Sequence, residues 1–124
     1  MKTYARWLFG LAALFNALVG LTLLLGLPQL GHALGLDSVN GTNLVFTSLT
    51  AGFIMLFAYT YLRLALDPAR FRVFIGFGVV GKLMAVLTAA ALFLLHVIDA
   101  RLPTLAGGDL IFAALFADYL RRTR

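Results

Sequence analysis

The chain has 124 residues, of which 62% are hydrophobic and 12% are charged, and its mean hydropathy is +0.98. A soluble domain carries about 25% charged residues, and a soluble chain of this length has too small an interior to bury so much apolar surface. The absence of cysteine from the sequence excludes disulfides, thiol redox chemistry and thiolate metal sites. The composition therefore predicts an integral membrane protein.

Four apolar segments follow one another along the chain, and we expect each to form a transmembrane helix. A membrane-spanning helix needs about 20 apolar residues, with about 17 to 25 tolerated. Strands are not expected, because lipid cannot satisfy an open backbone edge and no segment shows the period-two alternation of a barrel. Asp109 and Asp118 interrupt the fourth segment and make it the least apolar. The expected spans cover residues 6–28, 43–66, 69–98 and 103–121.

Turn signals separate the later segments. Asp67 followed by Pro68 is typical of an N-cap with proline at the first helical position, so the third helix should begin almost immediately after the second helix ends near Leu66. Pro103 can start the fourth helix in the same way. Short connections make successive helices antiparallel neighbours. The expected fold is all-α: residues 1–124 form one domain, a polytopic antiparallel up-down bundle of four transmembrane helices.

The basic residues predict the orientation of this bundle. Lys and Arg near the ends of spans stay on the cytoplasmic side. The connection 28–43 has neither residue, the third connection has only Arg101, and Lys82 lies inside a span. The eight remaining basic residues lie in the segments we assign to the cytoplasm: Lys2, Arg6, Arg63, Arg70, Arg72, Arg121, Arg122 and Arg124.

We therefore expect both termini of this multi-pass membrane protein to be cytoplasmic. The formal charge of +5 then lies at the membrane face that meets anionic lipid. Nucleic-acid binding is not expected, because its signature is a basic patch on a soluble fold. The expected partners are the lipid bilayer, a lipophilic ligand, and either further copies of the chain or a larger membrane complex.

Lys82 is the most unusual residue, because it lies near the middle of the third apolar segment. A charge at that depth is energetically costly unless it pairs with a group of opposite charge. Asp109 is the acidic residue at a comparable depth in another span, and the Lys stem can bridge the remaining axial gap. Asn16 falls near the midpoint of the first span and can join the pair. We therefore expect Lys82 and Asp109 to form an ion pair within the bilayer.

Small and polar residues recur at helical spacing on one stripe of each of the first three spans. Small residues beside a charge indicate close helix contact rather than a lipid-facing surface. We expect the stripes to converge with Asp109 at the bundle axis. The helix-packing positions would be Gly20, Gly52, Gly78, Ala85 and Ala89, and the polar site would contain Lys82, Asp109, Asn16 and Tyr59.

Two interpretations of the polar site remain open. A buried ion pair can simply fix how two helices pack. The intact pair contributes little net free energy to folding, whereas one buried charge without its partner is strongly destabilising. Ionisable groups within membranes also mark ion or substrate pathways. The sequence shows no phosphate-binding loop, no helical metal-binding His motif and no nucleophile with an evident base, so we expect no catalytic residue, metal or cofactor.

Motifs in the second half of the chain resemble a known family. Asp67-Pro68 with Arg70, Gly81-Lys82, and the run from Gly108 to Phe112 with Phe116 and Leu120 look like the DoxX-like small bacterial membrane proteins. The resemblance covers spans two to four. It implies a four-span inner-membrane fold and, in some relatives, an accessory role beside a redox complex, although this chain has no evident quinone or haem ligand pattern.

Three functions follow as hypotheses. The first is binding or transport of a small lipophilic or anionic ligand held against Lys82, with Asp109 tuning the charge. The second is a structural accessory subunit whose Phe- and Leu-rich surface meets a larger membrane complex. The third is a lipid-modifying membrane enzyme that uses Lys82 and Asp109 as acid and base, and it is the weakest, because no third group completes a mechanism.

Overall fold

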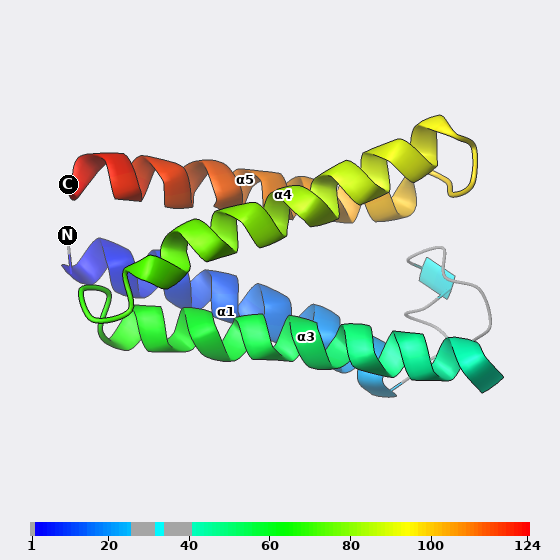
Figure 1. The fold of residues 1–124 in the computed structure, drawn as a ribbon, viewed down its shortest axis with the longest axis horizontal. Coiled ribbons are helices and arrows are strands. Elements are labelled where there is room, and N and C mark those ends of the chain that lie inside the picture. The colour runs from blue at the N-terminus through cyan, green and yellow to red at the C-terminus, as the bar shows by residue number, and fades with distance from the viewer. Residues whose placement is uncertain (1, 26–31, 34–40) are drawn as a thin grey trace. The chain divides into compact units, whose positions relative to one another are not determined.

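The computed structural model describes residues 2–25, 32–33 and 41–124, and these residues are all-helical or in turns. Four long helices follow in order: α1 (Lys2–Leu25), α3 (Gly41–Leu66), α4 (Val73–Leu94) and α5 (Arg101–Arg122) (Figure 1). The expected all-α class is confirmed. The first expected span extends to residue 28, and residues 26–28 lie outside the described part of the chain.

Three of these helices, α1, α3 and α4, are long and apolar enough to cross a membrane. They are consistent with a multi-pass membrane protein. With 22 residues, α5 has sufficient length but is less apolar, because Asp109 and Asp118 interrupt its hydrophobic sequence. All three candidate spans leave most of their surface uncovered, and only 11% of the most apolar window of α4 is buried. Such a surface suits lipid better than water.

The chain divides into two compact units, Met1–Phe71 and Arg72–Arg124, and each contains a helical hairpin. In the first unit, α1 and α3 run antiparallel and side by side (Figure 1). In the second unit, α4 and α5 do the same (Figure 1). The antiparallel arrangement expected for the third and fourth spans is confirmed.

Gly20 lets α1 and α3 approach closely in the first hairpin. A Cβ atom at this position would lie 2.7 Å from Met55 Sδ and 3.3 Å from Ile54 Cγ2, both on α3. Asn16, one turn earlier on the same face of α1, donates its side-chain N–H to the backbone carbonyl of Ile54 at 3.4 Å. A small residue and a side-chain hydrogen bond are the two features that hold helices together where water is absent.

The open end of the second hairpin is closed by Arg72. Its guanidinium donates to the carbonyl of Leu120 at 3.1 Å and to the hydroxyl of Thr123, both at the C-terminal end of α5. The last carbonyls of a helix have no intrahelical partner, and a cation there also interacts favourably with the helix dipole. Arg72 therefore caps α5 from the residue that precedes α4.

The third helix begins later than expected, at Val73 rather than at residue 69. Asp67 does act as a cap, because its Oδ1 accepts the backbone N–H of Arg70 at 3.2 Å. The capped segment is a single turn, with the N–H of Phe71 donating to the carbonyl of Asp67 at 3.3 Å. The Asp-Pro signal thus started a turn of helical type, but α4 begins only after it.

The third helix also ends earlier, at Leu94 rather than at residue 98. The N–H of Val97 donates to the carbonyl of Leu92 at 2.9 Å, and the N–H of His96 donates to that of Phe93 at 3.0 Å. This pair of bonds is a Schellman motif, which requires a left-handed residue where His96 lies. His96 has φ of 60°. Glycine usually occupies this position, so a histidine here is no clear signal that the helix ends.

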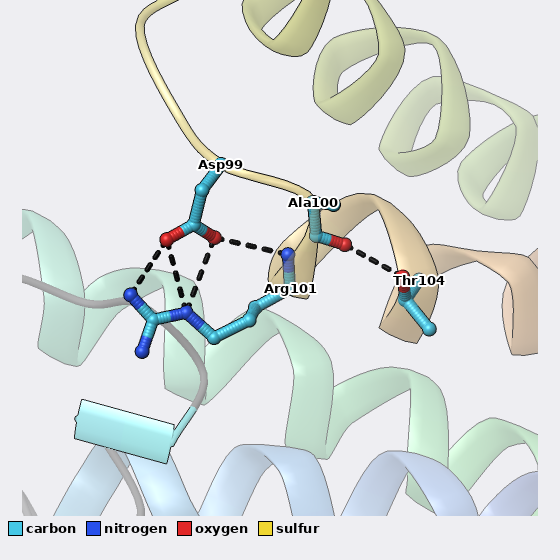
Figure 2. Close-up of polar contacts among 4 residues, drawn as sticks. All are labelled: Asp99, Ala100, Arg101 and Thr104. Carbon is cyan, nitrogen blue, oxygen red and sulfur yellow. Dashed lines mark hydrogen bonds and ion pairs between the residues drawn. The ribbon is translucent and has the colours of Figure 1, made fainter.

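The connection between α4 and α5 is organised by Asp99 (Figure 2). Its Oδ1 accepts the backbone N–H of Arg101 at 3.0 Å, and its Oδ2 lies 2.6 Å from Nη2 of the same arginine. The side-chain and backbone hydrogen bonds from Arg101 hold the pKa of Asp99 below its usual value, and the carboxylate raises the pKa of Arg101. Pro103 lies in the first turn of α5, where its missing N–H costs no intrahelical bond.

Candidate intramembrane polar site

The expected ion pair is present in the second hairpin. Lys82 Nζ donates to Asp109 Oδ1 at 2.6 Å, and the lysine side chain is 3% exposed whereas the aspartate side chain is 20% exposed. A charge-assisted hydrogen bond of this length is among the stronger polar contacts available to a protein. The pair thus joins the middle of α4 to α5 through two formal charges in an apolar setting.

The two helices hold the charged groups at similar depths. Lys82 lies twelve residues before the end of α4 at Leu94, and Asp109 lies eight residues after the start of α5 at Arg101. At about 1.5 Å per residue, these positions are about 18 Å and about 12 Å from the connected ends of the hairpin. The flexible lysine stem accounts for the difference. Both groups would lie well inside a hydrocarbon core about 30 Å thick.

An aromatic ring completes the surroundings of the ammonium group. Lys82 Nζ lies 5.2 Å from the ring centroid of Phe112, which follows Asp109 by three residues and therefore shares its face of α5. The Phe112 ring lies 6.2 Å, centroid to centroid, from the ring of Phe116, which is fully buried. A cation within about 6 Å of an aromatic face is attracted to the ring. Phe112 therefore adds an apolar wall that also stabilises the charge.

Sequence analysis did not single out Phe112 for this role. The signal was available, because positions three apart on a helix are neighbours and Asp109 was already a site candidate. Periodicity alone cannot distinguish a ring that faces a cation from a ring that faces lipid. The distance between Nζ and the ring is a property of the packed hairpin.

Asn16 has a different immediate partner from the one expected. Its side chain is buried, and its amide donates to Ile54 of α3 in the first hairpin. Lys82 and Asp109 belong to the second hairpin. The grouping of Asn16 with that pair stays a prediction, whereas its role in joining α1 to α3 is an observed contact.

Three expected positions on the inward stripes are instead exposed. Tyr59 is 58% exposed, Gly52 is exposed with open space where a Cβ would be, and Ala85 is also exposed. The assignment of all three to the inward stripes stays a prediction. The residues of α3 that are buried are Ala51, Ala58, Tyr61, Leu64 and Ala65.

The exposure of Tyr59 and Gly52 is explained by the composition of α3. Apolar side chains surround this helix on all sides, so the sequence pattern carries little information about which face packs. Tyr61, two residues from Tyr59, is 1% exposed and lies 6.0 Å, centroid to centroid, from the ring of Phe57. The choice between two tyrosines on different faces therefore depends on the neighbouring helix rather than on residue type.

The remaining packing positions fit the expectation to different degrees. Gly20 makes the close contact with Met55 described above, and Gly78 is buried on the same face of α4 as Lys82. Ala89 is half-buried. The buried residues of α4 are Ile75, Gly78 and Lys82, so the one small residue among them lies before the charge.

Among residues 2–25, 32–33 and 41–124, no group of three or more His, Cys, Asp or Glu side chains is placed to hold a metal ion. Asp118, near the C-terminal end of α5, pairs with Arg121 and Arg122 at 2.9 Å each. Asp99 pairs with Arg101. Asp99, Asp109 and Asp118 therefore serve ion pairs, and the Lys82–Asp109 pair is distinguished by its burial.

Comparison of the chain with protein-family models, with curated proteins and with solved structures finds no match. The resemblance of spans two to four to DoxX-like proteins therefore stands on the residues quoted for it. Any functional conclusion has to come from the chemistry of the site.

Proposed function

We propose that this protein is a multi-pass membrane protein that binds a small lipophilic or anionic ligand at the Lys82–Asp109 pair. The observation that carries the proposal is the 2.6 Å contact between these two charges in the middle of an apolar hairpin. Ionisable residues within a membrane are costly and mostly face functional sites. Replacing a buried ion pair by apolar residues is often neutral or stabilising, so packing alone gives little reason to keep one.

In this proposal all four helices cross a bacterial inner membrane as one bundle. The Lys82–Asp109 ion pair supports the assignment of α5 as the fourth transmembrane helix. An isolated Asp at the centre of a span costs about 2.5–3.5 kcal/mol on insertion scales. Pairing Asp109 with Lys82 offsets much of that cost, because the two charges cross the membrane as a neutral hydrogen-bonded unit. Asp118, close to the C-terminal end of α5, already has two arginine partners.

Both termini face the cytoplasm in this arrangement, because eight basic residues then lie on the cytoplasmic side. Reporter fusions at the C-terminus and within 28–43 test the topology. A reporter that is active only in the cytoplasm should be active at the C-terminus and inactive within 28–43. Equal activity at both sites would contradict the four-span arrangement.

The chemistry of binding follows from the exposure of the two partners. Lys82 is almost fully enclosed, while the Asp109 side chain remains 20% exposed and marks the side from which a ligand can approach. An acidic head group would accept a hydrogen bond from the ammonium beside Asp109 or in exchange with it. The Phe112 ring, 5.2 Å from Nζ, offers an apolar surface to the adjoining part of the ligand. Asp109 holds the ammonium in place when no ligand is present.

The test is direct analysis of what the protein carries from its native membrane. The wild type and a Lys82→Met/Asp109→Leu variant are extracted with a membrane-solubilising polymer, and the organic extract of each is analysed by mass spectrometry. The double variant leaves no lone charge, so it should stay folded. We expect a lipophilic acid or similar small molecule that is enriched with the wild type and lost with the double variant.

A matched control carries two substitutions of similar size on exposed surfaces. Met84→Leu on α4 and Leu110→Met on α5 alter exposed side chains next to the site in sequence and leave both charges in place. This control should retain the enriched molecule. If wild type, double variant and control carry the same small molecules, the ligand-binding proposal is wrong.

The second candidate function is that of an accessory subunit in a larger membrane complex. It is favoured by the extent of exposed Phe and Leu on both hairpins, which a protein partner can cover as well as lipid. In that case the ion pair only fixes α4 against α5. A stable assembly of defined stoichiometry would then purify equally with the wild type and with the Lys82→Met/Asp109→Leu variant.

A further inference from the structure

Two arginines in the first hairpin share a single aromatic ring. The guanidinium carbon of Arg63 lies 4.9 Å from the ring centroid of Phe71, and that of Arg70 lies 5.5 Å from the same centroid. By the sum of these distances, the two guanidinium carbons are at most about 10 Å apart, which is about the Debye length at 0.1 M salt. Two cations are therefore held close enough to repel each other.

The turn that follows α3 fixes this arrangement. Asp67 Oδ1 accepts the backbone N–H of Arg70, and the carbonyl of Asp67 accepts the N–H of Phe71. Arg63 lies in the last turn of α3, and its carbonyl accepts the N–H of Asp67 at 2.9 Å. The backbone thus brings both arginines and the ring together at one end of a candidate span.

Three arginines of the second unit have other partners. Arg72 binds the end of α5, while Arg121 and Arg122 pair with Asp118. Within the described ranges, neither Arg63 nor Arg70 forms an ion pair with a carboxylate. An anion that reaches both guanidinium groups would relieve their repulsion and accept hydrogen bonds from each.

We propose that Arg63, Arg70 and Phe71 form a binding site for the phosphate of an anionic phospholipid headgroup. All three residues lie within five positions of the end of α3 at Leu66, which is the depth of lipid phosphates when α3 spans the bilayer. Guanidinium groups match phosphate geometry, and basic sites at the cytoplasmic ends of helices hold such headgroups. Phe71 keeps the guanidinium groups in place and lies at the boundary between headgroups and acyl chains.

This inference rests on the membrane assignment but not on ligand binding at Lys82. The Lys82→Met/Asp109→Leu variant should therefore bind phospholipid as the wild type does. Loss of the small molecule with retained phospholipid binding, or the reverse, separates the two proposals.

The test is a titration of phosphatidylglycerol into the detergent-solubilised full chain, followed by native mass spectrometry. We expect a first phosphatidylglycerol to bind more tightly than later ones and more tightly than phosphatidylcholine. Arg63→Gln or Arg70→Gln should each weaken that first step roughly fivefold, the value for one basic residue near an anionic surface. The double variant should lose the distinction between the first and later steps.

A charge-matched control separates a site from general attraction. Arg121→Gln/Arg124→Gln removes the same charge from another part of the chain and should leave the first step unchanged. Inorganic phosphate added to the protein in phosphatidylcholine distinguishes lipid from free anion: it should not raise the thermal stability, whereas phosphatidylglycerol should. If the double variant does not fold, the two single variants carry the test.

Three results would overturn the proposal. One is a first binding step that the Arg63 and Arg70 variants leave intact. Another is equal weakening by the Arg121→Gln/Arg124→Gln control, which would show only diffuse attraction. The third is stabilisation by inorganic phosphate alone, which would assign the site to a soluble anion.

Discussion

Removing one partner of the Lys82–Asp109 pair should destabilise the second hairpin strongly, while removing both should not. A buried charge that has lost its partner costs about 3–5 kcal/mol. The two single variants should differ, because the survivor of Asp109→Leu is an ammonium that is 3% exposed in the native structure and the survivor of Lys82→Met is a carboxylate that is 20% exposed. We therefore expect Asp109→Leu near the upper end of that range and Lys82→Met near the lower end.

Two features of the structure alter the expected loss of stability in the single variants. The lysine stem can carry its charge toward a headgroup region at the cost of its packing, so Asp109→Leu should also loosen α4 near its middle. Loss of the contact between Nζ and the Phe112 ring removes a further ~0.5–2 kcal/mol in Lys82→Met. The double variant keeps neither charge. Its free energy of unfolding should therefore be within about 1 kcal/mol of that of the wild type, or higher.

The assay is reversible unfolding in mixed micelles of a mild detergent and dodecyl sulfate, followed by circular dichroism. The four proteins give a double-mutant cycle, and with these values for the single and double variants the magnitude of the coupling energy should be about 7 kcal/mol. A coupling energy near zero, with the double variant no better than the worse single variant, would refute the view that the two groups depend on each other. The reverse order of the single variants would refute the argument from exposure.

Three further predictions concern the helix ends and contacts. His96→Gly should raise the unfolding free energy by up to about 1 kcal/mol in the same assay, because glycine adopts a left-handed conformation without strain, and unchanged stability would contradict that account. Gly20→Leu should cost about 1–3 kcal/mol by displacing the Met55 side chain 2.7 Å from the added Cβ, and Met55→Ala should relieve most of that cost. Asp99 should titrate by carboxyl NMR below the usual value of about 3.9, and Arg101→Gln should return its pKa toward that value. Because the pKa of Asp99 is lowered in the folded state, its contribution to stability is present above the usual pKa and is lost as the pH falls through the lowered pKa. An Asp99 titration midpoint that Arg101→Gln leaves unchanged would count against the pairing.

The sequence alone determined the class of the protein and its central pair. An apolar fraction of this size leaves helices in a membrane as the workable arrangement. Lys82 and Asp109 could be paired from the sequence because a charge deep in a span needs an opposite charge at similar depth, and the chain offers few candidates. That argument uses depth along the helix, which is a simple function of residue number.

The tertiary structure decided which way each helix faces and where it ends. Tyr59 and Gly52 were expected inside and are exposed, whereas Tyr61 is the buried tyrosine of α3, because α3 is apolar on every side and only contact with a neighbour selects a face. The start of α4 at Val73 and its stop before His96 depend on a capped turn and a Schellman motif without glycine. Such features arise from backbone hydrogen bonds that residue type specifies only weakly, so depth was predictable from the sequence whereas azimuth and helix ends required the packed hairpins.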